Sequence, residues 1–186
     1  MKAKISFFAF TLFLFTLFIP HKIQAQEKAS GSSASSFNDI IVEKLRDNRA
    51  EILQKYFEQH DSPLAPYATE FISQADLYKL DWTMLPAISG TESTFATAEP
   101  EHCYNSWGWD IYGDHIHCFH SYDEAIRTIA QGIKQQYIDK WRATDIYSIG
   151  QYYAASPTWA SHTEFFMDQI KAFALLPENQ PLPISP

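Results

Sequence analysis

Apolar residues recur every three or four positions along most of the chain, which is the spacing of one helical face. Between positions 39 and 93 this period predicts three helices, over Asp39–His60, Ala65–Leu80 and Asp81–Ser93. Asp81 opens the third of them, because an aspartate side chain accepts hydrogen bonds from the free N–H groups at a helix start.

The same period returns after position 120 and predicts three more helices. The first begins at Ser121 with Glu124 three residues later, the pattern of a capping box. The second covers Asp145–Ala154. The third runs from Ser156 to Leu176 and has a proline at its first helical position.

The segment Thr94–His120 shows no helical period. It holds both cysteines, two of the five tryptophans and four of the seven histidines, and such loops on a helical scaffold often carry function. Its Tyr, Trp and Ile content predicts a small β-hairpin. We therefore expect a mostly α domain with a β-hairpin insertion, α+β in the broad sense.

The N-terminus has a different pattern. Lys2 and Lys4 precede an apolar run, Ile5–Ile19, that Pro20 ends. This layout predicts a secretory signal peptide, and the run is shorter than the roughly 20 residues of a spanning helix. An uncleaved membrane anchor is the alternative. The expected divisions are a signal peptide (1–25), a Gly/Ser-rich linker (26–37), one folded domain (38–176) and a Pro-rich tail (177–186).

Composition narrows the possible partners. The net charge of −8 argues against nucleic acid, because neutralising phosphates requires a basic face. An aromatic content of 16% predicts either an aromatic core or a groove lined with rings. We expect a monomer that is secreted or held in the cell envelope.

Cys103 and Cys118 predict a disulfide in an exported chain, and closing a loop of about 15 residues stabilises a fold by roughly 3 kcal/mol. Free or metal-bound thiols are the alternatives.

Glu92 is the strongest candidate for catalysis. It shares one predicted helical face with Leu85, Ile88 and Phe95. Apolar neighbours solvate a carboxylate poorly and so raise the pKa of the acid. A carboxylic acid that stays protonated can donate a proton to a glycosidic oxygen. The alternative is a helix-end carboxylate turned to water.

Two further motifs suit a sugar. In Asn105-Ser106-Trp107-Gly108-Trp109, the indoles can stack on sugar faces and the Asn amide can bind an N-acetyl group. In the segment Tyr153–Ala160 (YAASPTWA), a phenol ends one helix just before the next begins. The alternatives are tryptophans that pack on the core and a tyrosine buried in a helix joint.

Glu92-Ser93, then Asn105-x-Trp107-Gly108, then the YAASPTWA segment together resemble the glucosaminidase family of bacterial wall hydrolases, within the lysozyme-like superfamily. That family includes flagellar muramidase-like and mannosyl-glycoprotein endo-β-N-acetylglucosaminidase-like enzymes. The resemblance covers residues 77–170. Ala155-Ser156 stands where the family usually has Thr-Asp, and the insertion between the cysteines is a second departure.

The resemblance implies a lysozyme-like fold and hydrolysis of β-1,4 bonds next to N-acetylglucosamine, usually in peptidoglycan. It implies Glu92 as the general acid and Tyr153 as a groove tyrosine. Further candidate substrate-binding residues are Ser93, Asn105, Trp107, Trp109 and Trp159. Lytic transglycosylases also carry Glu-Ser, but this chain lacks their Gly-Leu-Met-Gln stretch. A non-catalytic glycan-binding module of the same fold is the other alternative.

A second catalytic carboxylate has three candidates in the segment Thr94–His120. An inverting enzyme needs one about 6.5–9.5 Å from the acid, and Asp110 is the preferred candidate over Asp114 and Glu101. The acetamido group of the substrate can replace it.

The histidines and cysteines of the insertion match no standard zinc finger, so we expect no metal and no cofactor. A metal-dependent hydrolase built on this segment stays as an alternative hypothesis, since alternating histidines can form metal sites.

Overall fold

The computed structural model of the chain describes residues 48–176. The predicted signal peptide, linker and Pro-rich tail lie outside these residues, as does the start of the first predicted helix. None of the helices in residues 48–176 combines the length and apolarity needed to cross a bilayer.

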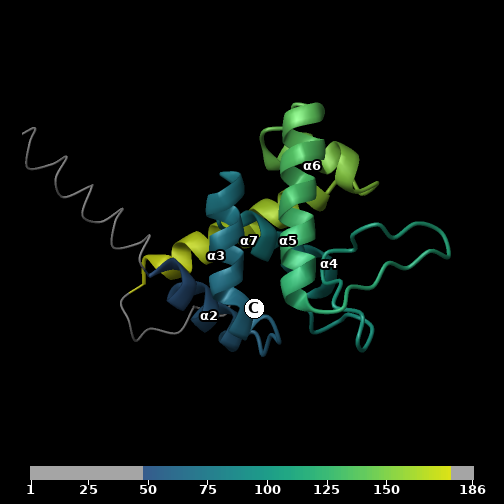
Figure 1. Ribbon diagram of the computed structural model, residues 1–186. Coiled ribbons are helices and arrows are strands. Elements are labelled where there is room, and N and C mark those ends of the chain that lie inside the picture. Colours follow the sequence, from purple (N-terminus) through teal and green to yellow (C-terminus); the bar gives the residue numbers. More distant parts are fainter. Residues whose placement is uncertain (1–47, 177–186) are drawn as a thin grey trace, which may run out of the picture. The chain divides into compact units, whose positions relative to one another are not determined.

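The described chain is mostly helical, as predicted, and each of the six predicted helices has a counterpart (Figure 1). The fourth continues without a break from an α-helix into a π-helix. In chain order the elements are α2 (Arg49–Gln59), the 3-10 turn η1 (Ala65–Tyr67), α3 (Ala68–Tyr78), α4 (Met84–Ser93), α5 (Tyr122–Gly132), the π-helix η2 (Ile133–Lys140), α6 (Ile146–Tyr153) and α7 (Trp159–Ala174).

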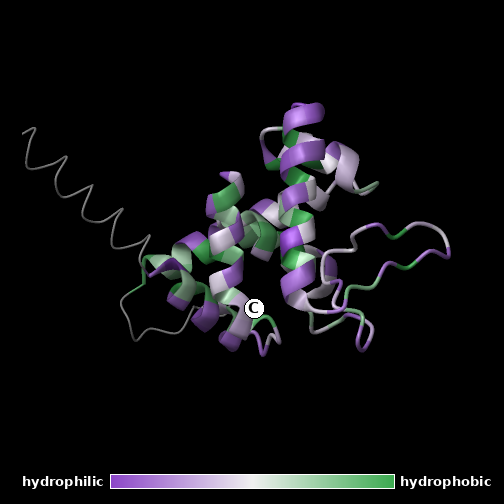
Figure 2. Cartoon of the chain, viewed as in Figure 1, coloured by the Kyte–Doolittle hydropathy of each residue, from purple (hydrophilic) through white to green (hydrophobic). Residues whose placement is uncertain are grey.

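Helix α4 is the centre of the core. Eight of its ten residues are buried, and it packs chiefly against α7. The hydroxyls of Thr91 and Thr163 join the two helices at 3.0 Å. Apolar stretches of the surrounding helices alternate with polar ones along each ribbon (Figure 2). Burying these stripes against α4 is the main source of fold stability, at about 25 cal/mol for each Å² of apolar area.

Helix starts agree with the sequence where side chains cap them. Asp145 and Ser148 form a capping box at the start of α6. The Ser121 hydroxyl accepts from the Glu124 N–H, but the Glu124 carboxylate bonds to the N–H of His120, so the predicted box is only half made. Asp81 accepts from the N–H of Thr83 but lies three residues before Met84, the first residue of α4, so this helix starts later than predicted.

The predicted β-hairpin is not confirmed. Within residues 48–176 the insertion holds an isolated bridge between Tyr112 and His115 and no strand. The physical reason is its backbone, which turns repeatedly into the left-handed region where a strand cannot continue. Residues of the insertion with positive φ are Thr94, Phe95, Ala96, His102, Tyr104, Gly108, Asp110 and Gly113.

Two sets of bonds hold the insertion in shape. Cys103 and Cys118 form the predicted disulfide, with their Cα atoms 4.5 Å apart. The Asn105 amide donates to the carbonyls of Trp109 and His117 at 2.8 and 2.7 Å, and it accepts from the N–H of Trp109. Asn105 thereby ties the outgoing and returning arms together, and the loop extends from the helices as a long excursion (Figure 1).

Candidate functional site

Glu92 occupies the last turn of α4 but not the apolar site that the sequence predicts. Leu85, Ile88 and Phe95 are almost fully buried, whereas the Glu92 side chain as a whole is exposed. The helix ends at Ser93 and Thr94 turns left-handed, so Phe95 enters the core from outside the helix. The prediction of an acid packed among these three side chains is therefore wrong.

The carboxylate of Glu92 nevertheless has two close neighbours of another kind. The indole N–H of Trp159 donates to Oε1 at 2.6 Å. Oε2 lies against Gly108, only 3.0 Å from where a Cβ of that residue would be. A helix end, a loop glycine and the first residue of α7 together fix the position of the acid.

Partial removal from water raises the pKa of Glu92 above the ordinary value of 4.5, and the hydrogen bond from Trp159 opposes this rise. The two effects fit the geometry. One removes water from the carboxyl group, and the other favours its ionised form because an N–H donor stabilises a negative oxygen.

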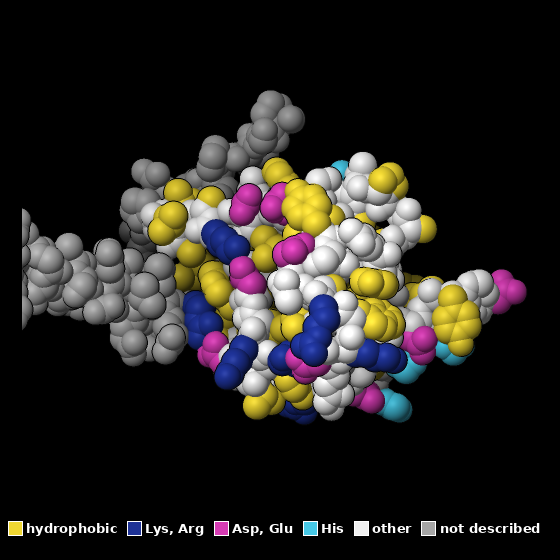
Figure 3. Space-filling model, turned by 90° about the horizontal axis from the view of Figure 1, so that it is seen from above, with side chains coloured by type: hydrophobic (Ala, Val, Ile, Leu, Met, Phe, Trp, Pro, Cys, Tyr) yellow, Lys and Arg dark blue, Asp and Glu magenta, His cyan; other side chains and the backbone are white. Residues whose placement is uncertain are grey.

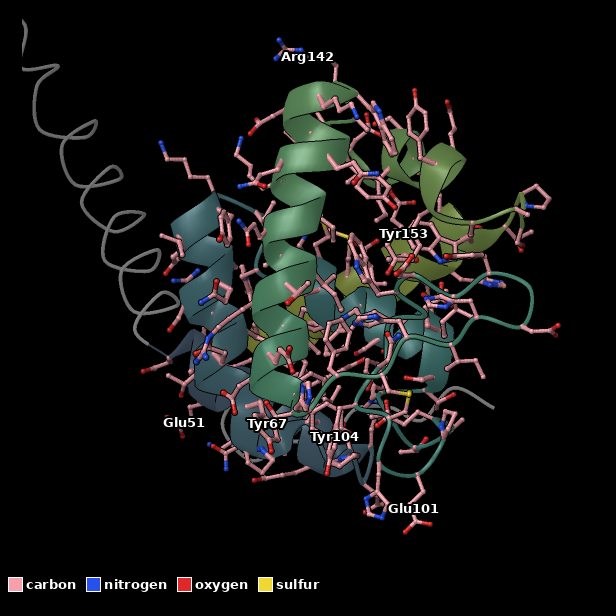
Figure 4. All side chains as sticks on the ribbon, turned by 45° about the vertical axis from the view of Figure 1, so that its right-hand side comes forward. Glu51, Tyr67, Glu101, Tyr104, Arg142 and Tyr153 are labelled. Atoms are coloured by element: carbon pink, nitrogen blue, oxygen red, sulfur yellow. A yellow bond between two sulfur atoms is a disulfide. The ribbon has the colours of Figure 1, made fainter. Side chains whose placement is uncertain are left out.

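Tyr153 lies at the end of α6, beside the insertion (Figure 4). Its ring stacks on Trp159, with centroids 4.7 Å apart. Its hydroxyl donates to the carbonyl of Trp107 at 2.8 Å. Burial and the nearby Glu92 carboxylate raise the pKa of Tyr153 well above 10, so the phenol stays a neutral donor. Tyr153 thus places the loop relative to α6 and α7.

A hollow of about 290 Å³ opens next to this group. Trp109, Tyr137 and Tyr153 give it aromatic walls, and Asp110 is the one carboxylate that lines it. Trp109 is seated directly against α5, since a Cβ at Gly132 would come within 2.6 Å of the indole. The hollow is lined by Gly108, Trp109, Asp110, Ile111, Gln136, Tyr137 and Tyr153.

A second hollow, of about 490 Å³, lies at the joint between α6 and α7. The segment Ala154–Pro157 of the predicted motif forms part of its wall, with Tyr147, Gly150, Gln151 and Ala160. Ala155-Ser156, where the sequence departs from the glucosaminidase pattern, therefore lines this second hollow.

Three predicted substrate-binding residues lie inside the protein instead. Trp107 is fully buried and its indole donates to the Leu85 carbonyl at 2.9 Å, so it is not a stacking platform. Ser93 is buried and donates to the carbonyl of Ser106 at 2.8 Å. Asn105 is buried and has its amide engaged within the loop. These three buried side chains therefore position the backbone around the site and do not contact a ligand at the surface.

The remaining predicted residues are brought together. Trp109, Asp110 and Tyr153 line one hollow, and Trp159 bridges Tyr153 to Glu92. Gln136 was missed by sequence reasoning. It reaches the hollow from the π-helix η2, and no residue pattern in that segment distinguishes a π-helix from an α-helix.

Gly108 gives a direct test of this arrangement. Its φ is +61° and a Cβ there would meet Oε2 of Glu92 at 3.0 Å. We expect Gly108→Ala to displace the carboxylate. Any reaction that depends on the placement of this carboxylate should then slow by about 10²-fold, the scale of a 1 Å misplacement.

Gly113→Ala is the matched control for Gly108→Ala. Gly113 has a similar φ of +55°, but a Cβ there would meet no heavy atom within 4 Å. Both variants carry left-handed strain of roughly 1–2 kcal/mol, visible in thermal melts, but only the first should lose activity. Equal loss of activity in both would mean that Gly108 acts through backbone strain alone.

Comparisons of the chain with protein-family models, with curated proteins and with solved structures give no match.

Proposed function

We propose that this chain is an exported glycoside hydrolase that cleaves β-1,4 bonds next to N-acetylglucosamine, with peptidoglycan as its substrate and Glu92 as its general acid. One observation carries the proposal: the Glu92 carboxyl group is held between Trp159 and Gly108, and Gly108 itself lines an aromatic-walled hollow. A partly desolvated acid beside stacking rings is what protonation of a glycosidic oxygen requires.

The aromatic lining supports a sugar as the ligand. Trp109 and Tyr137 are half-buried, so each keeps part of its ring surface available to a sugar. The disulfide between Cys103 and Cys118 supports export to an oxidising compartment, the cell surface or periplasm.

The second half of the reaction has two possible routes. Asp110 lines the same hollow and can activate water as a general base. Alternatively, the acetamido group of the substrate attacks the anomeric carbon itself, and no second carboxylate is needed. Comparing Asp110→Asn with wild type separates these routes, since only the first predicts loss of turnover with unchanged substrate binding.

Digestion of purified peptidoglycan tests the proposal. We expect muropeptides that end in a reducing N-acetylglucosamine, identified by mass after borohydride reduction. An anhydro end would instead identify a lytic transglycosylase. Absence of any product from peptidoglycan and from other N-acetylhexosamine glycans would overturn the proposal of an enzyme.

A non-catalytic glycan-binding module is the second candidate. The exposure of the Glu92 side chain favours it, because solvation by water stabilises the ionised carboxylate and so opposes protonation. A chain that binds peptidoglycan equally well as wild type and as Glu92→Gln, and releases no product in either form, would establish this alternative.

The dependence of turnover on pH follows from the raised pKa of Glu92. A general acid acts only while protonated, so kcat should fall as pH rises through that pKa, and the fall should lie above pH 4.5. In Trp159→Phe the ring is kept but the hydrogen bond that lowers the pKa is lost. Its alkaline limb should therefore shift to higher pH. A shift to lower pH, or none, would show that Glu92 does not set this limb.

A further inference from the structure

The structure brings three possible metal ligands together in the insertion, which we call the Asp110/His115/His117 cluster. One ligand atom from each side chain lies within 4.8 Å of the other two. Asp110 Oδ2 is 3.6 Å from His115 Nε2 and 4.0 Å from His117 Nδ1. Histidine and acidic side chains also gather where this loop leaves the body of the protein (Figure 3).

The spacing is close to what a metal ion needs. Bonds of about 2.0–2.1 Å in tetrahedral geometry place neighbouring ligand atoms roughly 3.4 Å apart. Asp110 and His115 are exposed and His117 is half-buried, so small side-chain rotations close the remaining gap without disturbing a core.

The backbone around the cluster is held in place before any ion binds. Tyr112 and His115 exchange two backbone hydrogen bonds and stack their rings at 4.7 Å. The carbonyl of His117 accepts from the Asn105 amide, and its ring packs against Phe119. A preformed backbone reduces the ordering that metal binding would otherwise require.

The chemistry of the ligands selects the class of ion. Two imidazoles and one carboxylate suit zinc and other late divalent transition metals, whereas magnesium and calcium prefer oxygen ligands. Both cysteines are paired in the disulfide, so thiolates take no part. Three protein ligands leave at least one position for water or another ligand.

We propose that the Asp110/His115/His117 cluster binds one zinc ion and fixes the tip of the insertion beside the hollow. Asp110 belongs both to the cluster and to the wall of the hollow. Occupancy therefore links the shape of the loop to the site next to Glu92, independently of whether Glu92 acts as an acid. A zinc-bound Asp110 is not free to act as a general base, so the zinc-bound form is compatible only with the acetamido route.

Zinc titration of the full exported chain, with any affinity tag removed, tests the proposal by competition against a chromophoric chelator at neutral pH. We expect one zinc per chain with micromolar or tighter affinity. His115→Ala, His117→Ala and Asp110→Asn should each weaken binding at least tenfold, roughly the scale seen when metal sites lose supporting interactions.

His102→Ala is the matched control, because His102 lies in the same insertion but outside the cluster and is exposed beside Glu101. It should leave the affinity unchanged, as should Glu92→Gln. Zinc should also slow proteolysis between residues 94 and 120 in wild type but not in His117→Ala. The proposal is overturned if zinc does not bind, or if His102→Ala weakens binding as much as the cluster variants.

Discussion

Glu92→Gln should abolish glycan cleavage while leaving the protein folded. The glutamine carbonyl can still accept the Trp159 indole N–H that Glu92 Oε1 accepts at 2.6 Å. It cannot donate a proton to a leaving oxygen. Removing a general acid costs about 10²–10⁴-fold, so turnover on peptidoglycan should fall by at least that factor.

The control for Glu92→Gln is Glu58→Gln, on α2, where the carboxylate accepts a hydrogen bond from Gln54 of the same helix and from no other side chain of residues 48–176. Substrate affinity of Glu92→Gln, measured on inert glycan fragments, should stay within a few fold of wild type. Turnover that survives in Glu92→Gln at the level of Glu58→Gln would remove Glu92 from the catalytic machinery and leave the hollow as a binding site.

The helices could be predicted because each buries one face, so its apolar residues recur every three or four positions in the sequence. Ile126, Ile129 and Ile133 are all fully buried, as their spacing indicates. Helix ends were less accessible to sequence reasoning. Lys79 and Thr94 end α3 and α4 in the left-handed conformation that glycine usually supplies, so neither end carries the usual glycine.

The insertion could not be predicted in the same way, because its shape comes from contacts distant in sequence. The cysteines indicated the disulfide, but the role of Asn105 depends on carbonyls 4 and 12 residues away. The aperiodic segment also gave no means of deciding which tryptophan faces inward. Sequence reasoning named Glu92 in one motif and Tyr153 and Trp159 in another as candidate site residues, but the direct bond from Trp159 to Glu92 required the packing of α7 on α4.

Trp107→Ala should remove a large part of the domain's free energy of unfolding. The indole is fully buried, packs 5.8 Å from the Phe71 ring and donates to the Leu85 carbonyl. Replacing a buried Trp by Ala costs about 3–5 kcal/mol, since the cavity that remains is only partly closed. Urea unfolding followed by far-UV circular dichroism measures this loss as a lower transition midpoint.

Trp109→Ala makes the comparison decisive, because the two tryptophans are two residues apart yet lie in different surroundings. Trp109 is half-buried and lines the hollow, so its loss should weaken glycan binding with a smaller change in unfolding free energy. Sequence alone gives both rings the same role as stacking platforms. Suppose instead that the free energy of unfolding of Trp107→Ala lies within about 0.5 kcal/mol of the wild-type value, the range of an ordinary surface substitution. If this variant also loses glycan affinity, then Trp107 is a stacking platform.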